Sequence, residues 1–255
     1  MVGSTPVTVS AAPGLEGMAT LTAIGLGLEV APRSADGLLL HLGEDGWSLR
    51  DGDTTIRADF LEGRMAARIR DAHRSEARLA TALGLKKHPD TLVLDATTGL
   101  GRDSVLAAAL GCHVIACERS KIVALLLRDA LVRADGGGMR ELASCIDVRE
   151  SDAREVLDAL DALATLGDRP EVILVDPMFP ERTKAAKAQK EMQLLQRLLG
   201  PDEDTEALLE SALAHATRRV VVKRPPHAPP VGGRKPSFEV EGKSARYDVY
   251  VVGEA

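Results

Sequence analysis

The residues of this chain with the clearest chemical potential form a glycine-rich turn, Asp95-Ala96-Thr97-Thr98-Gly99-Leu100-Gly101-Arg102-Asp103-Ser104. The turn follows the apolar run at residues 91–94, so we expect a buried strand to end at an acid and a helix to begin near Arg102. This arrangement presents a nucleotide-like cofactor to the carboxyl edge of a parallel sheet. Gly99 and Gly101 would let the backbone turn tightly and approach the ligand closely. A structural turn without a ligand is the alternative.

A second acid, Glu118, ends the next expected strand, 17 residues after Gly101. A carboxylate at that place can accept hydrogen bonds from both hydroxyls of a cofactor ribose that lies across the sheet edge. Its combination with the glycine turn favours ribose binding over a surface acid. The pair of motifs fits NAD and S-adenosylmethionine equally well.

A third loop, Asp176-Pro177-Met178-Phe179-Pro180, follows the apolar run at residues 172–175. An exocyclic amine of guanine or adenine is a poor nucleophile because its lone pair is delocalised into the ring. Acceptors at the Asp176 carboxylate and the Pro177 carbonyl could favour the pyramidal, nucleophilic amine, and the Phe179 ring offers a stacking face. The two prolines would stiffen the loop for in-line displacement at a sulfonium methyl. A rigid β-α turn is the alternative.

Cysteine placement argues against one rival chemistry. C5-methylation of pyrimidines needs a cysteine nucleophile, and Cys112, Cys117 and Cys145 all precede the Asp176 loop. Their odd number and the lack of a Cys-x-x-Cys pair support neither a disulfide framework nor a zinc site. The six histidines show no metal-ligand spacing, so we expect no metal.

Basic residues follow the Asp176 loop and end the fifth expected strand. They should flank the edge of the sheet where a phosphate backbone would run, so we predict that they contact RNA. These residues are Lys184, Lys187, Lys190, Lys223 and Arg224. A further basic run at residues 64–78 is interleaved with acids, and a solvated helix face explains it equally well.

Strands and helices that alternate along the chain must position these residues. Apolar runs predict strands at residues 91–95, 113–118, 144–149, 171–176 and 219–223. Helices are predicted at residues 102–110, 122–134, 153–166, 184–199 and 205–216. This alternation implies parallel strands joined by right-handed crossovers. Two later runs, 238–240 and 246–252, are separated by a short turn and should pair antiparallel.

The N-terminal part of the chain follows a different, β-rich pattern. A hairpin is expected from residues 38–42 and 47–50, with a further strand at 55–60. Residues 64–83 lack glycine and proline and predict one helix, which Gly84 ends. We therefore divide the chain into a small β-rich lobe at residues 1–60, a linking helix within residues 61–90 and a cofactor-binding domain at residues 91–255.

Composition sets limits on the remaining properties. The chain is 45% hydrophobic and 27% charged, which is enough for a packed core. Because 32 Lys and Arg face 38 Asp and Glu, the net charge is −6, and any nucleic acid must be bound by a local basic patch. The N-terminus lacks the features of a signal peptide and no apolar run could span a bilayer, so we expect a cytoplasmic protein without membrane contacts.

Five parallel strands closed by an antiparallel pair resemble the class I S-adenosylmethionine-dependent methyltransferases, an α/β fold with a Rossmann-like sheet. Within that class, the chain is similar to the ribosomal RNA small subunit methyltransferase J family, which methylates guanine N2 in 16S rRNA. The similarity covers about residues 58–252. The segments that carry it are 58–60, 95–103, 118–119, 176–180, 190–192, 199–202, 220–225 and 246–250.

The resemblance implies S-adenosylmethionine as cofactor and 16S rRNA, or the small ribosomal subunit, as partner. Asp176, Pro177 and Phe179 would then be the catalytic residues. The expected cofactor contacts follow the first four strands of the sheet: Asp95, Gly99, Gly101, Arg102, Asp103, Glu118, Arg119, Ser151, Asp152 and Asp176. Two positions depart from the family pattern, since Thr98 stands where Ala is expected and Asp152 where a second Ser is common.

Three other functions stay open at this point. The first is methylation of a different amino group in nucleic acid. The second, less favoured, is an NAD-dependent oxidoreductase on a similar sheet. The third is a non-catalytic RNA-binding module that kept the fold, against which the intact Glu118 and Asp176 argue.

Overall fold

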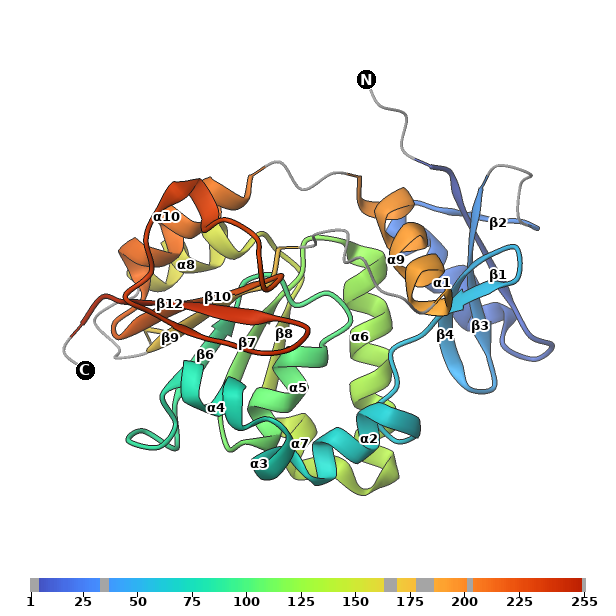
Figure 1. Cartoon of the computed structure of the whole chain (residues 1–255). Coiled ribbons are helices and arrows are strands. Elements are labelled where there is room, and N and C mark those ends of the chain that lie inside the picture. The colour runs from blue at the N-terminus through green and yellow to red at the C-terminus, as the bar shows by residue number, and fades with distance from the viewer. Residues whose placement is uncertain (1–4, 33–36, 163–168, 178–185, 201–203, 254–255) are drawn as a thin grey trace.

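The computed structural model describes residues 5–32, 37–162, 169–177, 186–200 and 204–253. It contains a five-stranded and a seven-stranded sheet. In Figure 1 the long helix α6 (Lys121–Ala134) stands between the two sheets. Side chains of α6 belong to the cores on both sides, so the two sheets are tied together by one helix.

The seven-stranded sheet holds the predicted functional loops. Its strands, in spatial order, are β11 (Phe238–Val240), β12 (Arg246–Val251), β10 (Arg219–Arg224), β9 (Val172–Val175), β6 (Leu92–Asp95), β7 (His113–Cys117) and β8 (Ile146–Arg149). The strands from β10 to β8 are parallel, and β12 pairs antiparallel with both β10 and β11. The predicted fold class, five parallel strands plus a C-terminal antiparallel pair, is confirmed.

Alternating apolar side chains let this sheet bury both faces. One face packs on α4 (Ala77–Leu83), α5 (Arg102–Ala109), α6 and α7 (Arg140–Ser144). The other packs on α8 (Ala153–Ala162) and α10 (Thr205–His215). Val93 lies on the first face and its neighbour Leu94 on the second, as period-two alternation requires. The layered arrangement fixes the strand ends rigidly, which is what a binding edge needs.

The N-terminal sheet has the spatial order β2 (Glu29–Val30), β1 (Val7–Ala11), β3 (Leu38–Gly43), β4 (Gly46–Asp51) and β5 (Thr54–Ile56). The predicted hairpin is confirmed as β3 and β4, and β5 is shorter than expected. The sequence prediction missed β1 and helix α1 (Glu16–Leu26). Because β1 pairs in parallel with β3, its partner lies 31 residues away and a local pattern cannot show it.

The described side chains of helix α9 (Ala186–Leu199) join the core of the N-terminal sheet, and none of them joins the cores of the seven-stranded sheet. Figure 1 shows it beside the N-terminal sheet, where Leu194 joins the core that contains Leu38 and Leu49. The crossover between β9 and β10 is instead filled by α10. The division into domains stays a prediction, but this packing ties a helix from the second half of the chain to the first sheet.

The single helix predicted at residues 64–83 is wrong. The chain forms three short helices there, α2 (Gly63–Arg70), α3 (Ala72–Ser75) and α4, with breaks at Asp71 and Glu76. Both break residues have φ near −105° and ψ near 25°, outside the helical region. The guanidinium of Arg68 holds the Glu76 carboxylate through two bonds of 2.8 and 3.0 Å, which stabilises the bent path. Gly84 ends α4 with φ +79°, as predicted.

The longest described helices, α6 and α9, have 14 residues each. A helix needs about 20 apolar residues to cross a bilayer. Within the described ranges, no helix has both the length and the apolar character for that.

Candidate active site

The glycine turn and the Asp176 loop lie side by side because β6 and β9 are neighbours in the sheet. Strand order reverses between them, since β7 follows on one side of β6 and β10 on the far side of β9. The Ala96 N–H donates to the Leu174 carbonyl at 2.8 Å, and the Asp176 N–H donates to Thr97 Oγ1 at 2.6 Å. A crevice at such a switch point is where open α/β sheets bind ligands.

The two glycines of the turn have left-handed backbone conformations, with φ of +56° at Gly99 and +77° at Gly101. Gly101 is the residue that begins α5, and its N–H donates to the Thr98 carbonyl at 2.9 Å. A side chain at either position is strained because Cβ approaches the carbonyl oxygen in this region. The turn therefore requires both glycines, as the sequence predicts.

Alanine at these glycines should separate core packing from ligand binding. A Cβ on Gly101 would lie 2.4 Å from Leu127 Cδ1, whereas a Cβ on Gly99 meets nothing closer than the Thr97 carbonyl at 4.0 Å. We expect Gly101→Ala to lower the free energy of unfolding by about 2–4 kcal/mol, through backbone strain and overpacking. Gly99→Ala bears only the strain of about 1–2 kcal/mol. It should weaken cofactor binding by about tenfold or more, because its Cβ points into open space at the edge of the sheet.

Urea denaturation and calorimetry measure these two effects independently. An unchanged affinity in Gly99→Ala would show that the ligand does not approach this turn. Equal stabilities of the two variants would show that the Leu127 contact is unimportant.

Glu118 connects the glycine turn to the loop after β7. Its buried carboxylate accepts from the Gly99 N–H at 3.0 Å and from the Ser120 N–H at 2.7 Å. Ser120 in turn caps α6 by accepting from the Val123 N–H at 3.4 Å. These two backbone bonds hold the carboxylate in a fixed orientation. Ribose binding by Glu118 stays a prediction, and the carboxylate stands at the edge where a ribose would lie.

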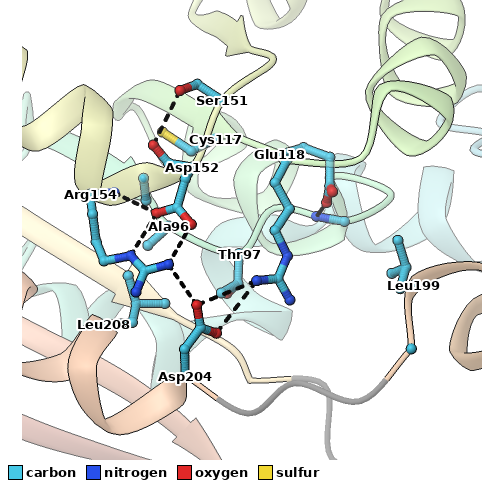
Figure 2. Close-up of a pocket in the computed structure, with 14 residues that line it drawn as sticks. Ala96, Thr97, Cys117, Glu118, Ser151, Asp152, Arg154, Leu199, Asp204 and Leu208 are labelled. Atoms are coloured by element: carbon cyan, nitrogen blue, oxygen red, sulfur yellow. Dashed lines mark hydrogen bonds and ion pairs between the residues drawn. The ribbon is translucent and has the colours of Figure 1, made fainter. Parts of the chain in front are cut away.

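The ends of β6, β7 and β8 surround a small cavity of about 70 Å³, which Figure 2 shows. Asp204, which directly precedes α10, points toward Arg154 in this view. Its Oδ2 lies 2.6 Å from Arg154 Nη2, and its Oδ1 lies 3.4 Å from Arg119 Nη1. Arg119, Ser151 and Asp152, all predicted cofactor contacts, line this cavity with Glu118.

Asp152 is held by Arg154 through a bidentate ion pair, with Nε to Oδ1 at 2.9 Å and Nη2 to Oδ2 at 2.7 Å. These side-chain hydrogen bonds lower the pKa of Asp152 and outweigh the opposing effect of burial. Ser151 donates to Glu155 Oε2 at 2.6 Å. Asp152 is therefore an ionised acceptor at this cavity, and its contact with the cofactor stays a prediction.

Sequence reasoning missed Arg154 and Asp204 as parts of this cavity. Arg154 is two residues after Asp152, and a local pairing of that kind could have been suspected. Asp204 reaches the cavity from 50 residues away, across a stretch of chain that includes β9 and α9. No sequence pattern marks such a contact.

Three carboxylates and one ammonium group gather at the ends of β6, β9 and β10. Lys223 Nζ lies 2.7 Å from Asp103 Oδ2 and 2.7 Å from Asp176 Oδ2. Asp95 lies deeper, where its carboxylate accepts from Ser104 Oγ at 2.5 Å and from the Thr97 N–H at 3.2 Å. We call Asp95, Asp103, Asp176 and Lys223 the acidic cluster.

Burial has opposite consequences for the two kinds of charge in this cluster. It raises the pKa of Asp95 to about 7, because the buried carboxyl is stabilised in its neutral form. Burial also disfavours the charge of Lys223, but the two carboxylates outweigh it and raise the lysine pKa overall. With Lys223 charged, the cluster has an excess of negative charge.

A second, larger cavity of about 520 Å³ opens over the acidic cluster. It is of the size that binds small ligands, about 300–1,000 Å³. Thr97 and Gly99 line both this cavity and the smaller one, so a cofactor laid across the glycine turn would extend into both. Arg102, Asp103 and Pro177, all predicted site residues, also line the larger cavity.

The basic residues predicted to contact RNA have diverse environments. Lys223 is engaged in the acidic cluster, and Arg224 is only 5% exposed, with Nη2 donating to the Pro229 carbonyl at 2.5 Å. This burial speaks against the predicted contact of Arg224 with RNA. Lys190 is exposed on α9. Phe179, Lys184 and the side chain of Lys187 lie outside the described residues.

The described residues fit S-adenosylmethionine in three respects. Space is open over Gly99, an oriented carboxylate ends the second strand, and the acidic cluster complements the positive sulfonium and ammonium groups of that molecule. Cys117, which also lines the small cavity, has its pKa raised to about 12 by burial, so it is no nucleophile at neutral pH.

The sheet order, the terminal antiparallel pair and these loops define an S-adenosylmethionine-dependent methyltransferase. The model of a family described as SAM-dependent methyltransferases matches residues 24–252. The Ribosomal RNA small subunit methyltransferase J of Thioalkalivibrio sulfidiphilus is 44% identical to this chain, and the match spans 89% of this chain and 90% of that protein. The protein of the same name from Pseudomonas syringae is 42% identical, and the match spans 88% of this chain and 83% of that protein. The chain belongs to the ribosomal RNA small subunit methyltransferase J family, and S-adenosylmethionine is its methyl donor.

The solved structures extend this likeness to the N-terminal sheet. A SAM-dependent methyltransferase from Neisseria gonorrhoeae superposes with a TM-score of 0.73 at 30% identity, and covers 98% of this chain and 97% of that one. The expectation that the resemblance begins only near residue 58 is therefore too narrow. The likeness to this structure includes the N-terminal sheet.

Proposed function

We propose that this enzyme transfers the methyl group of S-adenosylmethionine to the exocyclic N2 amine of one guanine in 16S rRNA. The observation that carries the proposal is the position of Asp176, which ends β9 beside the glycine turn and lines the larger cavity. The names of relatives that are 40–44% identical support small-subunit ribosomal RNA as the substrate.

The chain's own residues must make the guanine amine nucleophilic. The Asp176 carboxylate and the Pro177 carbonyl would accept the two amine hydrogens and hold the nitrogen pyramidal. The N2 lone pair forms the new bond to the methyl carbon as the carbon–sulfur bond breaks, and the sulfur retains that electron pair. The methylated amine then loses one proton to water, so positioning and electrostatics supply most of the rate.

Lys223 would hold Asp176 in place for this task. Its ammonium bridges Asp176 to Asp103, which is anchored at the start of α5. When bound, S-adenosylmethionine supplies an electrophilic methyl on a positively charged sulfur, which the acidic cluster would stabilise.

We propose the cytoplasm as the place of action and 16S rRNA, free or in the small ribosomal subunit, as the partner. Nucleoside mass spectrometry of 16S rRNA from cells that lack the gene tests this directly. We expect the loss of one N2-methylguanosine, which purified enzyme and S-adenosylmethionine restore on that RNA or on the subunit. An unchanged nucleoside profile would contradict the proposal, and a missing methyl on adenine would favour a different amino-group methyltransferase.

A further inference from the structure

Three cationic side chains converge on the mouth of the larger cavity from two distant parts of the chain. Arg64 lies on α2, Arg78 on α4, and Lys243 in the turn between β11 and β12. All three are exposed and line the cavity that also contains Asp176. We call Arg64, Arg78 and Lys243 the basic rim.

The breaks in the predicted helix create this convergence. In one straight helix, Arg64 and Arg78 would be separated by about 21 Å along the axis. The bends at Asp71 and Glu76 divide the segment into α2, α3 and α4, and both arginines line one cavity. The turn of the β11–β12 pair closes against α4, because a Cβ on Gly242 would lie 3.4 Å from Arg78 Cδ. The rim is therefore built by tertiary packing.

The basic rim is not neutralised by the surrounding protein. Two other arginines of the cavity have acidic partners: Arg68 pairs with Glu76, and Arg102 lies 3.7 Å from Glu191. Among the described residues, no ion pair or side-chain hydrogen bond engages Arg64, Arg78 or Lys243. The cavity thus has an acidic floor and a basic entrance, which suits a cationic donor below and a polyanion above.

We propose that the basic rim binds the phosphate backbone of the RNA strand that carries the target guanine, on either side of that nucleotide. The base would pass between these phosphate contacts toward Asp176. A protein with a net charge of −6 needs such a local patch to bind RNA at all. This inference rests on the proposed function, since it assumes an RNA substrate for the same site.

The test compares two double variants with equal charge changes. Arg64→Glu with Arg78→Glu alters the rim, whereas Arg70→Glu with Arg74→Glu alters exposed arginines of α2 and α3 that do not line the cavity. We expect the rim variant to raise the KM for 16S rRNA by about tenfold or more. The slope of log affinity against log salt should become shallower by about 1.4, as for two lost phosphate contacts. The control variant should stay within about twofold of wild type in KM.

Two further measurements keep the test decisive. Calorimetric affinity for S-adenosylhomocysteine should be unchanged in the rim variant, which shows that the fold and the donor site survive. Lys243→Glu, on a different element, should raise the KM in the same direction. Equal KM and salt slopes in the rim and control variants would overturn the inference. A wild-type enzyme that methylates neither 16S rRNA nor the small subunit would instead overturn the proposed function.

Discussion

Replacing Asp176 with alanine is expected to lower kcat for methyl transfer by about 10²–10³-fold, the usual cost of losing one preorganised electrostatic group. The reason is that the guanine amine loses its charged acceptor and returns to the planar, delocalised form. Affinity for S-adenosylhomocysteine should fall by less than about tenfold, because Gly99 and Glu118 still form the rest of the binding edge. Single-turnover methylation and calorimetry measure the two effects.

Two companion variants sharpen this prediction. Asp176→Asn keeps a carbonyl acceptor without the charge, so its kcat should lie between those of wild type and Asp176→Ala. Asp147→Ala removes an exposed acid of β8 whose one ion pair among the described residues is with Arg149, two residues along the strand, and it should leave kcat unchanged. Full activity in Asp176→Ala would remove this carboxylate from the mechanism.

Replacing Lys223 with methionine is expected to damage both stability and catalysis. The free energy of unfolding should fall by about 2–3 kcal/mol, less than the 3–5 kcal/mol of a fully buried pair because Asp176 is 37% exposed. Without its cation, the Asp176 carboxylate would hold a proton more tightly. The acidic limb of the pH profile of kcat should therefore move to higher pH, since the protonated form cannot accept from the amine.

A double variant identifies the origin of these effects. Lys223→Met with Asp103→Asn removes one positive and one negative charge, so most of the lost stability should return. Urea denaturation at neutral pH measures this recovery. If the double variant is no more stable than Lys223→Met, then lost packing of the lysine stem explains the loss rather than uncompensated charge.

Local rules account for the parts of the site that sequence reasoning placed correctly. An apolar run that ends in an acid or a glycine turn predicts the carboxyl end of a parallel strand, and all such ends meet at one edge of the sheet. Asp95, Gly99, Glu118 and Asp176 therefore lie together, as the structure shows. The roles assigned to these residues await the experiments above.

The same local rules do not predict which segments from distant parts of the chain come into contact. Lys223 was predicted to contact RNA from its place after a strand, but β10 lies beside β9, so its ammonium meets Asp176 and reaches Asp103. Helical periodicity at residues 64–83 suggested one helix, but the Arg68–Glu76 ion pair and the buried apolar residues of this segment favour a bent path. Electrostatic pairing across the fold overrides a local pattern.

Local patterns in the chain are sufficient to assign the class of this protein: the alternation of strands and helices, the glycine turn, Glu118, the Asp176 loop and the family to which the chain belongs. These features are local, because strand ends and turns depend on neighbouring residues. The pairing of charges, in contrast, depends on the folded arrangement of distant elements. The acidic cluster, the link from Asp204 to Arg154 and the basic rim each join side chains from distant elements. Which side chains meet in these groups depends on how the two sheets pack against the shared helix α6, and no short stretch of sequence encodes that packing.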